Sequence, residues 1–283
     1  MRAVMIRVAV VAMLSSSSMA LCPSLAAADV VTHCNQTISG VSELANDLDC
    51  TGSSVPAITM EAGAYLELNG HNVKGGTTGI NCKKSCKIRG PGIVSDATIG
   101  INAYGTLKLL GVEVTANAVG VQCYKKGDVS GGSIHDNAGP GITATGLLKL
   151  DFVTIEDNAG DGVLSASFPQ LGGGVKIDGG TISGNRNGVV ADKSVKVSRA
   201  LITANLEDGI RVGEEDCHGG GVVQLGKTSV VRDNAVSSDC GTTVACADVA
   251  SCKKPKVKDA TCLTSSVLNS GVPGSDWDVC TND

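Results

Sequence analysis

Residues 134–163 read IHDNAGPGITATGLLKLDFVTIEDNAGDGV, and this stretch contains the same pattern twice, 21 residues apart. In each copy an asparagine, Asn137 or Asn158, stands four residues before a glycine that is followed by Ile or Val. Self-similarity at such a period is typical of solenoid proteins, in which each repeat is one supersecondary unit. The Gly-(Ile/Val) pair recurs in steps of 20, 21 or 26 residues, at Gly79, Gly100, Gly120, Gly141, Gly162, Gly188 and Gly209.

Apolar and polar residues alternate over short runs within each repeat, as in Leu148-Lys149-Leu150 and Val153-Thr154-Ile155. Alternation over so few residues indicates a short strand with one buried face, and helical spacing persists nowhere. Three such strands per repeat of about 21 residues predict an all-β fold, a parallel β-helix of about eight to nine coils in which each coil hydrogen-bonds to the next. The asparagines would stack at one corner and bond across coils.

The motif Leu66-Glu67-Leu68-Asn69-Gly70-His71 and the recurring Asn-Gly-(Ile/Val) units resemble the pectate-lyase-like superfamily over residues 60–237. The ending, from Cys262 to Cys280, resembles the cysteine-rich tail of uncharacterised secreted bacterial members. The resemblance implies a right-handed, single-stranded parallel β-helix. It also implies a polysaccharide lyase, hydrolase or epimerase, with Ca²⁺ as a cofactor if the protein is a lyase; apart from that case we expect no cofactor.

Composition and the first residues indicate an exported, acidic protein. The chain has 283 residues, a formal charge of −5 and 2% aromatic residues, which disfavours a nucleic-acid partner. Residues 1–28 are typical of a signal peptide, with Arg2 and Arg7 before an apolar stretch and Ala26-Ala27-Ala28 at the cleavage site. No later apolar segment is long enough to span a membrane. We therefore expect a secreted, periplasmic or cell-surface protein.

Cysteines mark the two ends of the predicted solenoid. We expect a capping segment at 29–62, β-helix repeats at 63–237 and a cysteine-rich cap at 238–283, with a short helix at 41–48 as an alternative within the first segment. Export permits disulfides, and the cysteine spacing does not suit zinc. Eleven cysteines follow the signal peptide, so one is unpaired, and Cys123 falls on an inward position. The cysteines expected in disulfides are Cys34 with Cys50, Cys82 with Cys86, and three bridges among Cys217, Cys240, Cys246, Cys252, Cys262 and Cys280.

Two turns are long enough to hold catalytic groups, at residues 165–174 and 213–221. Acids with a base could perform general acid/base chemistry, or Ca²⁺-assisted proton abstraction beside a uronate carboxyl. The alternative, which we favour, is a solvated loop held by Cys217. His71 and His135 have no partner visible in the sequence and are poor catalytic candidates. The catalytic candidates are Glu214, Glu215, Asp216, His218, Arg211, Lys193 and Asp192.

Outward residues of the first strand form a predicted column that is rich in lysine. Because parallel coils lie about 4.8 Å apart, lysines on successive coils could match charges along an anionic polysaccharide. The alternative is a solvated face that prevents edge association. Tyr104 and Tyr124 occupy equivalent places in consecutive coils and are expected to stack, as a structural pair or as a sugar-binding platform. The column contains Lys87, Lys108, Asp128, Lys149, Lys176, Lys196 and Gln224, and its binding candidates are Lys149, Lys176 and Lys196.

Three functions fit these features. The sequence favours a non-catalytic β-helix that associates with extracellular or envelope polysaccharide, because most of the predicted turns are minimal. A polysaccharide lyase, hydrolase or epimerase is the alternative that the resemblance implies. A purely structural or adhesion module is the third.

Overall fold

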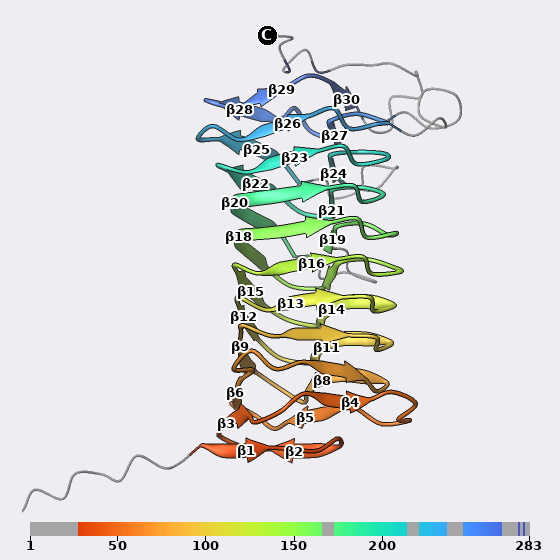
Figure 1. The fold of residues 1–283 in the computed structure, drawn as a ribbon. Helices are drawn as coiled ribbons and strands as arrows, with labels where there is room; N and C mark the ends of the chain where they lie inside the picture. Colours follow the sequence, from red (N-terminus) through yellow and green to blue (C-terminus); the bar gives the residue numbers. More distant parts are fainter. Residues whose placement is uncertain are drawn as a thin grey trace, which may run out of the picture.

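The computed structural model describes residues 28–165, 173–213, 221–236 and 246–267, together with residues 277 and 280. Their regular secondary structure is entirely β-strand, and the strands stack as successive coils along one axis (Figure 1). The fold is a right-handed parallel β-helix, as predicted. None of the residues in these ranges belongs to a helix that could cross a membrane. The predicted signal peptide lies outside the described residues, apart from its last position.

Each coil contributes strands to three ladders, and the strand pairings of the described residues are parallel. The long strands β18 and β20 bend through the first two ladders, so these form one 19-stranded sheet, whereas the third ladder is an 11-stranded sheet. The first ladder follows β1 (Asp29–Val31) with β3 (Val41–Leu44), β6 (Tyr65–Glu67), β9 (Cys86–Arg89), β12 (Leu107–Leu110), β15 (Gly127–Ser130), β18 (Leu148–Glu156), β20 (Val175–Ser183), β22 (Val195–Ser198), β25 (Val223–Gly226) and β28 (Lys256–Lys258).

The second ladder contains the later halves of β18 and β20 and eight shorter strands. These are β4 (Leu48–Cys50), β7 (Val73–Gly75), β10 (Ile93–Ser95), β13 (Glu113–Thr115), β16 (Ser133–His135), β23 (Leu201–Thr203), β26 (Val230–Arg232) and β29 (Thr261–Cys262). The third ladder contains β2 (Gln36–Ile38), β5 (Ile58–Met60), β8 (Thr78–Cys82), β11 (Ile99–Ala103), β14 (Val119–Cys123), β17 (Ile142–Ala144), β19 (Val163–Ser165), β21 (Val189–Ala191), β24 (Ile210–Val212), β27 (Val249–Ser251) and β30 (Ser265–Val267).

The core is a column of aliphatic side chains inside the coils. Alternation within each strand sends every second residue inward, and equivalent residues of successive coils are partners in register, as Val121, Ile142 and Val163 are. All three side chains are fully buried. A single coil could not bury its own apolar face, so the stacking of neighbours stabilises the fold.

A continuous ladder of asparagine side chains runs through one corner, as predicted. Asn158 Nδ2 donates to Asn185 Oδ1 at 2.9 Å, and Asn158 Oδ1 accepts from the backbone N and Nδ2 of Asn137 at 3.2 and 2.8 Å. The same pattern extends from Asn117 through Asn205. The ladder ends when Asn234 Nδ2 donates to the Asp248 carboxylate at 2.8 Å. This last bond is charge-assisted and therefore stronger than the amide bonds before it.

In the repeats from Gly100 to Gly209, the glycine is required by the asparagine of the next coil. A Cβ placed on Gly141 would lie 2.9 Å from Asn158 Nδ2 and 2.8 Å from the carbonyl oxygen of Gly162. Any larger residue would therefore push the neighbouring coil away. The pairing of Asn with Gly in the sequence follows from this close approach.

Strands reach into both predicted caps, so the third ladder has eleven strands, more than the regular repeats alone supply. Residues 41–48 form β3 and the start of β4, not the alternative helix. The predicted bridges Cys34–Cys50 and Cys82–Cys86 are present, and Cys123 is buried and free. Burial raises the pKa of the Cys123 thiol. In the C-terminal cap Cys262 bonds Cys280, and Cys246 and Cys252 are disulfide-bonded, whereas Cys217 and Cys240 lie outside the described residues.

Candidate functional site

The predicted lysine column is present and in register on the first ladder. Lys149 pairs with Lys176, and Lys176 pairs with Lys196, on the adjacent strands β18, β20 and β22. Lys176 and Lys196 are exposed, and Lys149 is half-buried. The column continues through Gln224 to Lys256, one coil beyond the predicted end. The strand spacing of about 4.8 Å therefore sets a regular separation between the backbones that carry these charges.

Positive charge is concentrated on this side of the molecule. We define the basic face as the outward side of the first ladder and the corner that precedes it, over residues 83–89, 104–110, 124–130, 145–151, 173–178 and 192–198. These segments contain eleven of the chain's 23 Lys and Arg residues but four of its 28 Asp and Glu residues. An acidic protein therefore presents one basic surface, which attracts polyanions more strongly than the net charge suggests.

The acidic residues beside the column are only partly available to neutralise it. Asp178, which the sequence places two positions after Lys176, is bound by Arg199, whose Nη2 lies 2.8 Å from the Asp178 Oδ2. The hydrogen bond from Arg199 lowers the pKa of Asp178, with smaller contributions from the charges of Lys227 and Lys176. Asp178 therefore keeps its charge but is engaged mainly by Arg199, from the next coil.

Tyr104 and Tyr124 stack within the basic face, at the corner that precedes the first ladder, as expected. Their ring centroids are 5.0 Å apart and the rings are nearly parallel, with 5° between the planes. The residues remain 51% and 41% exposed, so the pair offers an accessible aromatic surface. Lys125 and Lys126 follow Tyr124 directly in the chain. An aromatic surface beside lysines can contact both the apolar face and the charges of an acidic sugar.

The proposed acid/base cluster is only partly contained in the described residues. Asp192 and Lys193 lie at the turn between β21 and β22, and Arg211 lies in β24, one coil further on. Arg211 Nη1 is 3.9 Å from Asp208 Oδ2, an acidic partner that the sequence analysis missed. The remaining candidates, Glu214, Glu215, Asp216 and His218, fall outside these residues. In the ranges that the structure covers, no three His, Cys, Asp or Glu side chains are grouped to hold a metal ion.

The two histidines that lacked partners in the sequence do have them in the fold. His135 Nε2 lies 3.3 Å from Glu113 Oε1, and His135 Nδ1 lies 2.7 Å from Asp136 Oδ2. Burial alone would lower the pKa of His135, but the hydrogen bonds to Asp136 and Glu113 outweigh it and raise the pKa. His71 Nδ1 is 3.4 Å from Asp47 Oδ1. Each partner except Asp136 is distant in sequence, which is why the pairs were missed.

Comparison with known proteins gave matches to solved structures alone. No family model matches the chain, and no curated protein does. The A-module of the mannuronan C-5 epimerase AlgE4 from Azotobacter vinelandii is 12% identical, over 85% of this chain and 80% of that one, with a TM-score of 0.49. The A-module of AlgE6 from the same organism is 13% identical, over 85% and 79%, with a TM-score of 0.46. These comparisons concern the fold alone.

Proposed function

We propose that this protein is an exported β-helix that binds an anionic extracellular polysaccharide along its basic face without cleaving it. The observation that supports this most is the run of in-register lysines on a surface that holds eleven basic and four acidic residues. A polymer with regularly spaced carboxylates or sulfates would meet one lysine per coil. The disulfides are consistent with an oxidising compartment outside the cytosol.

A non-catalytic role is supported by Asp178, one of the acids on the basic face. Asp178 is engaged by Arg199, and its lowered pKa makes it a poor proton donor at neutral pH. Lys176 is suited to hold an anion, since its register partners on both sides, Lys149 and Lys196, are also lysines. We therefore assign this surface to binding.

The test compares retention on immobilised alginate or pectate for the wild-type protein and the double variant Lys149→Gln/Lys176→Gln. Exposed ion pairs contribute about 0.2–1 kcal/mol each, so affinity should fall between about twofold and thirtyfold. Added salt should weaken wild-type binding, because exposed charges are screened. The matched control Lys74→Gln/Arg232→Gln removes two charges from the second ladder and should bind like the wild type.

Equal retention of both double variants would refute the basic face as the binding surface. Incubation of the protein with the same uronans, with and without Ca²⁺, should yield no unsaturated product absorbance. Product that disappears in a Glu214→Ala/Glu215→Ala/His218→Ala variant would replace the binding assignment with a lyase.

A further inference from the structure

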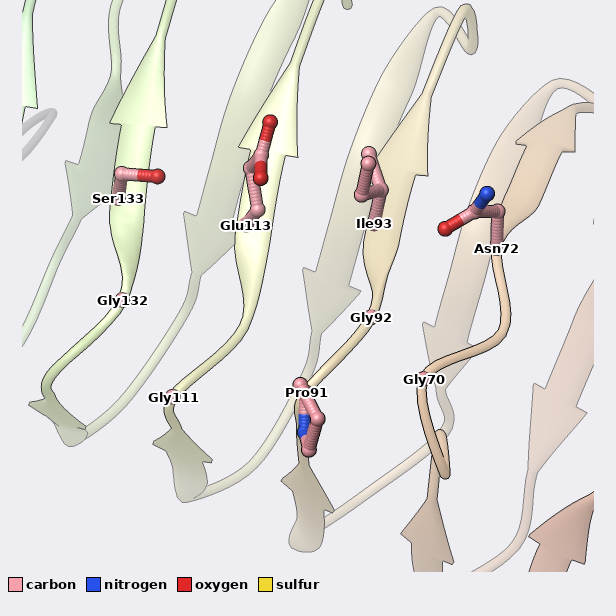
Figure 2. A pocket seen from close by; sticks show the side chains of 9 residues that line it. All are labelled: Gly70, Asn72, Pro91, Gly92, Ile93, Gly111, Glu113, Gly132 and Ser133. Carbon is pink, nitrogen blue, oxygen red and sulfur yellow. The ribbon is translucent and has the colours of Figure 1, made fainter.

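A shallow groove lies along the corner between the first and second ladders, after the ends of the strands β9, β12 and β15. It has a volume of about 480 Å³ and crosses four successive coils (Figure 2). This size falls within the range of small-ligand sites, about 300–1,000 Å³. We call it the corner groove, and it is lined by Gly70, Asn72, Pro91, Gly92, Ile93, Gly111, Glu113, Gly132 and Ser133.

The groove exists because glycines leave the backbone bare at this corner. A Cβ on Gly132 would lie 2.2 Å from the Val112 carbonyl oxygen, so no side chain can be built there without moving the backbone. Gly111 has a φ of +61° and nothing within 4 Å of a built Cβ, so a side chain there would project into open space. The position of Gly111 is occupied by Gly131 in the next coil and by Phe152 in the coil after that. The Phe152 side chain is 57% exposed. The bare corner therefore ends at an aromatic ring.

Three polar side chains and one aliphatic side chain lie along the groove. Ile93, Glu113 and Ser133 are register partners on β10, β13 and β16, and Asn72 directly precedes β7 in the coil before them. Figure 2 shows these four side chains in a row across successive strands. Within the described residues, the Asn72 amide, Glu113 Oε2 and the Ser133 hydroxyl have no hydrogen-bond partner. Three polar groups are thus available to a ligand around one aliphatic contact.

One oxygen of the Glu113 carboxylate is held by His135 of the next coil. His135 Nε2 is 3.3 Å from Glu113 Oε1, and the Asp136 carboxylate, 2.7 Å from Nδ1, fixes the other side of the imidazole. Glu156 is the register partner of His135 on the next coil. The Glu113 and Asp136 carboxylates flank this imidazole, and Glu113 presents its second oxygen to the groove, so an anionic ligand would be repelled. A carboxylate, an amide and a hydroxyl are suited to the hydroxyl groups of an uncharged sugar.

We propose that the corner groove binds one uncharged sugar unit of a saccharide. The Glu113 carboxylate accepts hydrogen bonds from the sugar hydroxyl groups, and the Asn72 amide and the Ser133 hydroxyl form further hydrogen bonds with them. Ile93 packs against the C–H face of the sugar ring. The bare backbone at Gly111 lets the ring approach closely. The corner groove would select an uncharged sugar, whereas the basic face would select an anionic polymer, and binding at one does not depend on the other.

The experiment titrates the full-length exported protein with neutral trisaccharides of glucose, mannose, galactose and xylose. Binding is followed by saturation-transfer NMR and calorimetry. Gly111→Asn fills the groove with a residue that tolerates left-handed backbone, and Glu113→Gln removes the acceptor charge. Glu113→Gln should weaken the binding of the best trisaccharide at least about tenfold, which corresponds to the loss of one charge-assisted hydrogen bond, and Gly111→Asn should weaken it at least as much because its side chain occupies the groove.

Matched controls separate this site from the basic face and from misfolding. Gly63→Asn places the same residue at a left-handed glycine with equally open space at another corner, where φ is +79°. It should bind sugar like the wild type, as should Lys149→Gln/Lys176→Gln. If Gly111→Asn has a lower melting temperature than the wild type, sugar binding by the double variant Glu113→Gln/Ser133→Ala is the deciding measurement. The proposal is overturned if the wild type binds none of the sugars, if folded groove variants bind normally, or if the lysine variant loses sugar binding.

Discussion

Substitution of Asp208 by Asn should stabilise the protein at neutral pH. Asp208 is 2% exposed, and its burial raises the pKa to about 6. The Ala247 backbone N–H, 2.8 Å from Oδ1, and the nearby Arg211 partly offset the rise, whereas Glu207 and Asp248 add to it. At pH 7 the folded protein therefore carries a buried carboxylate that is incompletely compensated.

The size and sign of the effect follow from the linkage between protonation and folding. A carboxyl group with a raised pKa in the folded state contributes stability that is complete below its ordinary pKa of 3.8 and is lost as pH rises through about 6. Two pKa units correspond to about 3 kcal/mol. Asn cannot ionise, and Asn187 already occupies the equivalent buried place one coil earlier. The free energy of unfolding of Asp208→Asn should exceed that of the wild type by about 3 kcal/mol at pH 7 and by less than about 1 kcal/mol at pH 4.

Urea unfolding of both proteins at pH 4, 5, 6 and 7, with the disulfides oxidised, measures this difference. Thermal unfolding at pH 7 is a second measurement. The melting temperature of the variant should be higher by roughly 6–12 °C, since about 1 kcal/mol shifts the melting temperature of a domain of this size by roughly 2–4 °C. Asp233→Asn removes the same formal charge at an exposed position and controls for net charge. Parallel pH profiles for wild type and Asp208→Asn, or a less stable variant at pH 7, would refute the reasoning.

Two further predictions concern the asparagine ladder and His135. Asn158→Ala leaves the buried backbone N–H of Asn137 without its acceptor and removes one of the three acceptors of the Asn137 side-chain amide, so urea unfolding should show a loss of about 2–4 kcal/mol; a loss below about 1 kcal/mol would contradict the ladder's role. NMR titration should place the pKa of His135 above 6.5, because its carboxylate bonds outweigh burial, and Glu113→Gln should lower it. An unchanged pKa in that variant would mean that Glu113 does not bind the imidazole in solution.

The columns of lysine and tyrosine side chains could be predicted from the sequence, because equivalent residues of successive coils occupy equivalent positions along the axis. Lys149, Lys176 and Lys196 lie 27 and 20 residues apart, yet they are register partners on adjacent strands of the first ladder. The Tyr104–Tyr124 stack follows from the same equivalence. Any property that depends on equivalent positions in neighbouring coils can be inferred from spacing alone.

Contacts between unequal positions could not be predicted in this way. His135 on β16 is the register partner of Thr115 on β13. Its imidazole also binds Glu113, which lies two positions before Thr115 on β13. The corner groove depends on which turn glycines leave open space, and Gly111 and Gly132 look alike in the sequence but differ in what surrounds them. At the C-terminal end the spacing becomes irregular, so the place of Asp248 at the end of the asparagine ladder was also hidden.

The regular lysine spacing has a consequence for the kind of ligand that the basic face can hold. A single acidic sugar that contacts one exposed lysine gains at most about 1 kcal/mol, too little for measurable binding at moderate concentration. A polymer that spans the coils of Lys149, Lys176 and Lys196 adds such contacts together, because the first contact raises the effective concentration of the next. The rigid stack also holds the strands that carry the lysines in fixed register, so little backbone ordering opposes association. The basic face is therefore suited to long chains and unsuited to their monomers, which is the selectivity expected of a protein that stays attached to a polymer.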